Sequence, residues 1–109
     1  MKGTRVYQVE EVVRRSVARQ LLLELPDIAP YTTITRVEAS ADLRHATVWV
    51  GVVGGQDGDQ VVARLVGVAG AFQQAAAGSL ATKMTPRLHF RLDTNAQYAE
   101  DIDRLLKQT

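Results

Sequence analysis

The sequence predicts an α+β domain with one three-stranded sheet and helices packed on one face of it. Three observations support this class: an amphipathic first segment, two β-branched runs close enough to form a hairpin, and a glycine-interrupted helical stretch followed by a third strand. With 109 residues, 46% of them apolar and 23% charged, the chain is sized for one core. We therefore expect a single domain over residues 1–109.

The first segment, Arg5–Leu25, has the periodicity of a helix. On its polar face we predict two ion pairs at the i,i+4 spacing, Glu10–Arg14 and Glu11–Arg15. Its apolar residues recur at intervals of three and four and form one stripe. This stripe consists of Val6, Val9, Val13, Val17 and Leu21.

Two strands follow the first helix. Thr32–Ala39 is rich in β-branched residues, and Ala46–Val52 alternates between apolar and other side chains. Only a short turn separates them, so we expect an antiparallel hairpin, with Trp49 in the core. A glycine-rich loop comes next, and its last residue, Asp59, is the expected N-cap of the following helix.

A second helical pattern extends from Gln60 to Thr82, with Phe72 on its core face. Gly67 and Gly70 interrupt this pattern, and each costs about 1 kcal/mol relative to alanine inside a helix. This cost predicts a kink, a break, or close approach by another backbone.

A third strand is predicted after Pro86, where three apolar residues alternate with Arg87, His89 and Arg91. One face of this strand is therefore basic. The pattern from Ala96 to Lys107 predicts a short C-terminal helix.

The sequence offers little for catalysis, metals or membranes. No nucleophile or base accompanies His45 or His89 in a recognisable motif, so we expect no catalytic residue and no enzyme. Asp57 and Asp59 lack the further oxygen ligands of a calcium loop, and cysteine is absent, so no metal or cofactor is expected. No segment has the length and apolarity of a signal or a membrane span, which favours a cytoplasmic protein.

Positive charge is concentrated in the second half of the chain. Between Gln60 and Leu92 there are four basic residues and no acidic ones. Such a surface suits a polyanion such as RNA, and ordinary solvated charge is the alternative. Arg19 has no acidic partner at helical spacing and extends the predicted patch. The four basic residues are Arg64, Lys83, Arg87 and Arg91.

Two motifs resemble the bacterial ribosome-binding factor A family. The run from Thr33 to Val48 matches the family's hairpin pattern T-I-T-x-V-x-x-S-x-D-L-x-x-A-x-V, and the run from Pro86 to Asp93 matches P-x-L-x-F-x-x-D. The resemblance implies a type II KH-like fold, α-β-β-α-(kink)-α-β with a short C-terminal helix. In this family an Ala-Xaa-Gly kink replaces the Gly-Xaa-Xaa-Gly loop of other KH domains. The aligned triplet here is Val68-Ala69-Gly70, which keeps the glycine and has valine in place of alanine.

The resemblance also implies a function. A member would be a monomeric, non-enzymatic assembly factor that binds the free small (30S) ribosomal subunit, through 16S rRNA and neighbouring ribosomal proteins. It would assist late maturation of 16S rRNA near its 5′-terminal helix, with the greatest importance for growth in the cold. Two alternatives stay open: a generic KH-like RNA-binding module, and a small α+β domain that binds a protein or metabolite. The predicted RNA-binding residues are Lys83, Arg87, Arg91, Arg64, Gln73, Gln74 and Arg19.

Overall fold

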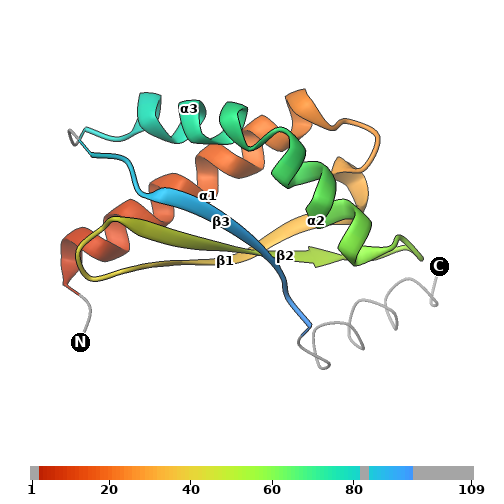
Figure 1. The fold of residues 1–109 in the computed structure, drawn as a ribbon, viewed down its shortest axis with the longest axis horizontal. Helices are drawn as coiled ribbons and strands as arrows, with labels where there is room; N and C mark the ends of the chain where they lie inside the picture. Colours follow the sequence, from red (N-terminus) through yellow and green to blue (C-terminus); the bar gives the residue numbers. More distant parts are fainter. Residues whose placement is uncertain (1–2, 82–83, 95–109) are drawn as a thin grey trace.

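The computed structural model describes residues 3–81 and 84–94, which form a three-stranded sheet with helices over one side (Figure 1). The order is that of the predicted type II KH-like α+β fold. The predicted C-terminal helix, Ala96–Lys107, lies outside the described residues. The elements are α1 (Thr4–Glu24), the short 3₁₀ helix η1 (Ala29–Tyr31), β1 (Thr32–Ala39), β2 (His45–Val52), α2 (Gly58–Gly67), α3 (Ala69–Ser79) and β3 (Arg87–Leu92).

Strands β1 and β2 form the predicted antiparallel hairpin. Polar side chains organise its turn. The Ser40 hydroxyl donates to Asp42 Oδ1 over 2.6 Å, and the same carboxylate oxygen accepts the N–H of Arg44 over 3.1 Å. Leu43 adopts a left-handed conformation with φ 59°, and its side chain packs against the core. The Ser-x-Asp-Leu motif is thus the turn of the hairpin.

Strand β3 lies next to β2 and parallel to it, so the sheet order is β1-β2-β3. A parallel neighbour needs a crossover connection, and α2 and α3 provide it. Strand β3 is therefore an edge strand that follows two helices, and it faces the segment where those helices meet.

The core lies between the sheet and the helices. The predicted apolar stripe of α1 is buried along its whole length. Phe72 on α3 is fully buried, as expected, and its ring lies 5.4 Å from that of Phe90 on β3, measured between centroids. This aromatic contact joins the second half of the crossover to the edge strand.

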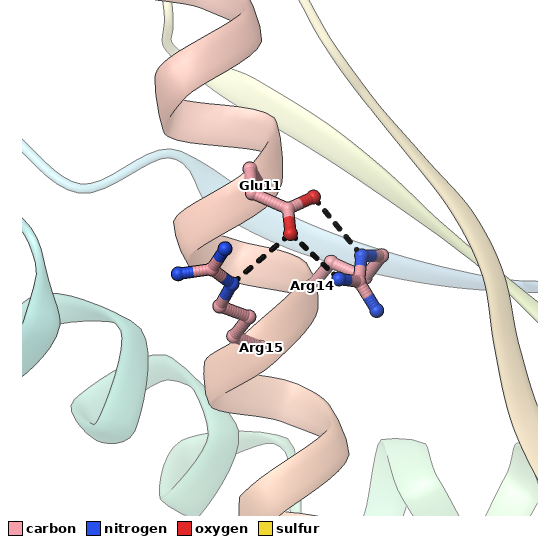
Figure 2. Close-up of polar contacts among 3 residues, drawn as sticks. All are labelled: Glu11, Arg14 and Arg15. Atoms are coloured by element: carbon pink, nitrogen blue, oxygen red, sulfur yellow. Dashed lines mark hydrogen bonds and ion pairs between the residues drawn. The ribbon is translucent and has the colours of Figure 1, made fainter.

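One of the two predicted ion pairs on α1 is wrong. Glu10 is only 8% exposed, and its carboxylate accepts the backbone N–H of Ala39 over 2.7 Å. Glu11 instead binds both arginines, with Arg14 Nη2 at 2.6 Å and Arg15 Nε at 3.0 Å, as Figure 2 shows. The hydrogen bond from Arg14, with that from Arg15 and both positive charges, lowers the pKa of Glu11 to about 2.

The N-cap of α2 is Asp57 rather than the predicted Asp59. Asp57 Oδ1 accepts the N–H groups of Asp59 and Gln60 over 3.0 and 3.2 Å. The helix begins earlier because Gly58 can enter its first turn beside Leu92. A Cβ added to Gly58 would lie 2.7 Å from Leu92 Cδ1, so glycine lets α2 approach the end of β3 closely.

Candidate nucleic-acid interface

The predicted interruption of the second helical region is a break centred on Val68. Helix α2 ends at Gly67, α3 begins at Ala69, and Val68 between them has φ −117° and ψ 26°. Valine is compatible with this negative φ, so the substitution in the Ala-Xaa-Gly motif does not prevent the break. Gly70 lies in the first turn of α3, and a Cβ added to it would meet nothing within 4 Å.

A groove of about 590 Å³ lies between this break and β3, and we call it the kink groove. Gly70 lies on its helical side, so the N-terminal turn of α3 borders the groove. Such a turn presents free backbone N–H groups and the positive end of the helix dipole. The residues lining the kink groove are Val66, Ala69, Gly70, Gln73, Arg87, Leu88, His89, Phe90 and Arg91.

Gln73 joins the two walls of the groove. Its amide Nε2 donates to the carbonyl of Pro86 over 2.7 Å, and its Oε1 accepts the N–H of Leu88 over 3.1 Å. Gln73 was predicted as an RNA contact, but its amide already caps the edge of β3. Further along the same edge, strand alternation turns the N–H of Phe90 away from β2 and toward the groove.

The β3 wall of the groove is positively charged. Arg87 and Arg91 are exposed, and neither has an ion-pair partner within the part of the chain that the structure describes. His89 lies between them. Burial, the neighbouring His45 and the charges of the two arginines lower the pKa of His89. This wall therefore favours an anion.

The structure does not bring every predicted RNA-binding residue to this groove. Arg64 on α2 instead forms a bidentate ion pair with Asp27, at 2.6 and 3.1 Å, and hydrogen bonds from Arg64 lower the pKa of Asp27. Arg19 on α1 and Gln74 on α3 are exposed but do not line the groove. Lys83 lies outside the described residues.

Sequence reasoning did not select His89 or Phe90, although both line the groove. The alternation of β3 placed His89 on the same face as the two arginines, which was the available signal. The edge position of the strand, which leaves the Phe90 N–H pointing away from β2, required knowledge of the sheet order.

Trp49 was predicted to lie in the core, and this prediction is wrong. It is half-buried on the sheet face that points away from the helices, because Val48 and Val50 beside it take the core positions of β2. The guanidinium of Arg36 stacks over the indole, 4.6 Å from the ring centroid. We call this sheet face the open face.

Residues 3–81 and 84–94 hold neither a metal-binding cluster nor a membrane-spanning helix. No group of three His, Asp or Glu side chains there could hold a metal ion. No helix in that part of the chain is long and apolar enough to cross a membrane.

Comparisons with known proteins agree with this architecture. The family model described as ribosome-binding factor A matches residues 5–106. A ribosome-binding factor A from Thermomicrobium roseum is 36% identical over 110 residues, which cover 99% of this chain and 85% of that protein.

Two solved structures share the fold. One is the NMR structure of a Thermotoga maritima protein, with a TM-score of 0.71 and 26% identity over 84% of this chain and 90% of that one. The other is the crystal structure of ribosome-binding factor A from Thermus thermophilus, with a TM-score of 0.71 and 18% identity over 80% of this chain and 93% of that one. The extent of the family match, together with the identity to the Thermomicrobium protein, shows that this chain belongs to the ribosome-binding factor A family.

Proposed function

We propose that this protein binds the free small (30S) ribosomal subunit and assists late maturation of 16S rRNA near its 5′-terminal helix, without catalysing a reaction. Family membership supports a ribosomal partner. The single structural observation that carries the RNA contact is the kink groove, which has two arginines without ion-pair partners along its β3 wall. The protein acts as a monomer in the cytoplasm, and growth in the cold depends on it most.

The groove suits recognition of an RNA backbone. Arg87 and Arg91 supply positive charge for phosphates, and the first turn of α3 presents N–H groups beside Gly70. The N–H of Phe90 adds a donor on the opposite wall. These groups read phosphate position and shape rather than a base sequence.

Such binding influences rRNA folding through affinity alone. A protein that binds one rRNA conformation more tightly than another shifts the population toward the first by that difference in free energy. Misfolded rRNA rearranges more slowly at low temperature, so the shift matters most in the cold.

Gradient sedimentation tests this proposal directly. The protein is mixed with purified small subunits, large subunits or intact ribosomes, at a low and a high salt concentration. We expect it to sediment with small subunits alone, and less of it at the higher salt because phosphate contacts release counterions. Absence from the small-subunit fraction at both salt concentrations contradicts the proposal.

A charge-matched pair of double variants tests the groove. Arg87→Gln/Arg91→Gln should weaken binding to small subunits by at least tenfold, in line with the loss of two phosphate contacts. Arg14→Gln/Arg15→Gln removes the same charge from α1, away from the groove. The affinity of this variant for small subunits should stay much closer to that of the wild type. Equal losses in the two variants would show that total charge, rather than the groove, determines binding.

A further inference from the structure

Two histidines from different strands form a direct contact on the open face. His45 Nδ1 on β2 lies 3.0 Å from His89 Nε2 on β3, and the ring centroids are 5.2 Å apart. At this distance one nitrogen donates a hydrogen to the other. If both rings are imidazolium ions, both of these nitrogens carry a hydrogen, so the hydrogen bond is lost and two positive charges face each other. The contact therefore favours at most one charge on the pair in the free protein.

Cations surround this imidazole pair. Arg87 lies directly opposite His45 in the register of β2 and β3, and Arg91 follows His89 on the same face of β3. All four side chains are exposed. We call them the open-face cluster.

The acidic groups on the neighbouring segments are already engaged. Just after β3, Asp93 Oδ2 accepts the hydroxyl of Thr35 over 2.6 Å. On β1, Glu38 forms an ion pair with Arg36 at 3.1 Å. In the hairpin turn, hydrogen bonds from the Ser40 hydroxyl and the Arg44 backbone lower the pKa of Asp42. The side chains between the cluster and β1 are those of Thr47, opposite His89, and Trp49, opposite Arg91. No described carboxylate forms an ion pair with a member of the cluster.

We propose that the open-face cluster is a second phosphate site, at which an RNA phosphate binds together with a proton taken up from solvent by the His45–His89 pair. The inference rests on the proposed function, because the phosphate belongs to RNA. The site is continuous with the kink groove, since Arg87, His89 and Arg91 also line that groove. An RNA strand in the groove therefore reaches the open face by crossing the edge of β3.

The physical basis is that a bound phosphate brings negative charge into a site where the neighbouring groups of His89 are positive or titratable. In the free protein, partial desolvation of the exposed ring, together with His45 and the charges of Arg87 and Arg91, lowers the pKa of His89. A phosphate bound among these groups offsets their charge and raises the pKa of His89. A raised pKa in the complex means that affinity increases as pH falls, by up to about tenfold per pH unit for one proton taken up.

Fluorescence anisotropy with a labelled oligouridylate tests the proposal, because uracil does not titrate in the acidic range. Binding is measured between about pH 5.5 and 8, at constant ionic strength. We expect the wild-type protein to bind at least tenfold more tightly at the acidic end. His45→Gln/His89→Gln should bind with little dependence on pH, because glutamine keeps polar groups at these exposed positions but does not titrate.

Nuclear magnetic resonance of the imidazole Cε1–H groups gives a second readout. The pKa of His89 should rise when oligouridylate is added. Gln56→His, in the loop after the opposite end of β2, supplies a control imidazole outside the cluster. The pKa of that imidazole should change much less.

The outcomes separate this inference from the proposed function. An equal pH dependence in the wild type and the double variant overturns the second phosphate site, as does an unchanged His89 pKa in the presence of RNA or a failure to bind oligouridylate. The sedimentation experiment with small subunits decides the proposed function independently, at a single pH.

Discussion

Glu10 and Glu11 are adjacent carboxylates with opposite environments. Glu10 is buried against the end of β1 and accepts the backbone N–H of Ala39. Glu11 is half-exposed and binds two guanidinium groups on the surface of α1 (Figure 2). A buried donor without an acceptor is costly, whereas exposed ion pairs contribute little. Of these two carboxylates, only Glu10 therefore forms a hydrogen bond that connects α1 to the sheet.

Substitution of Glu10 tests that difference. Glu10→Ala should lower the free energy of unfolding by about 1–3 kcal/mol, because the N–H of Ala39 loses its acceptor. Glu10→Gln should retain much of that stability, because the amide oxygen can still accept the hydrogen. Urea denaturation measures both values, and Glu11→Ala is the control, with a much smaller expected loss. A larger loss for Glu11→Ala would contradict this assignment.

The stability contributed by Glu11 should depend on pH. Its pKa is about 2 in the folded chain, below the ordinary value of 4.5. A lowered folded pKa means that the contribution is complete above about pH 4.5 and disappears as pH falls toward 2. We expect the difference in thermal stability between the wild type and Glu11→Gln to shrink over this range, and also with added salt. A difference that grows toward low pH would contradict the assignment.

At the scale of elements, the break between α2 and α3 determines both the shape and the chemistry of the groove. Gly70 borders the groove, and a Cβ atom added to it would have no neighbouring atom within 4 Å. Gln73, one turn later, binds the α3 wall to β3 through two hydrogen bonds. One residue thus leaves the groove open, and the other fixes its width.

Gly70→Ala should separate stability from binding. Alanine in a helix is favoured over glycine by about 0.5–1 kcal/mol, and space is available for the added methyl group, so the melting temperature should rise. The same methyl group enters the kink groove and should weaken binding to small subunits several-fold. Gly67→Ala is the matched control, because Gly67 has equal space but does not line the groove. Unchanged binding by Gly70→Ala would show that the ligand does not approach this backbone.

Neighbouring glutamines on α3 should behave differently. Gln73→Ala leaves the Leu88 N–H and the Pro86 carbonyl without their partner, so it should lower the free energy of unfolding by about 1–3 kcal/mol. Gln74→Ala removes an exposed side chain and should leave stability within about 0.5 kcal/mol of the wild type. Chemical denaturation of both variants measures the difference. Similar stabilities for the two would argue against the role of Gln73 at the edge of β3.

For the molecule as a whole, the sequence predicted the helices and strands better than the side-chain contacts between distant segments. Hydrophobic periodicity is local, and it placed α1, the hairpin, the interrupted helix and β3 within a few residues of their positions. Contacts between distant segments leave no such pattern. The Arg64–Asp27 ion pair and the carboxylate of Glu10 beneath β1 depend on tertiary packing. The sequence therefore shows neither that Arg64 has an acidic partner nor that Glu10 binds a backbone N–H instead of Arg14.

The candidate site shows the same limit. Alternation along β3 identified Arg87 and Arg91, which do line the groove. The partner of Gln73 and the contact between His45 and His89 were not predictable, because both depend on which strand lies beside β3 and in which register. The order of elements alone permits several such arrangements.

Because β3 lies at the edge of the sheet, it also affects whether copies of the protein aggregate in concentrated solution. An edge strand with free backbone groups can pair with the same strand of another copy, and such pairing starts aggregation. Here the amide of Gln73 occupies part of the edge, and the repulsion between the charges of Arg87 and Arg91 in two copies opposes the rest. The side chains that we propose to bind RNA should therefore also oppose aggregation, and the solubility of the protein should be greatest at low ionic strength.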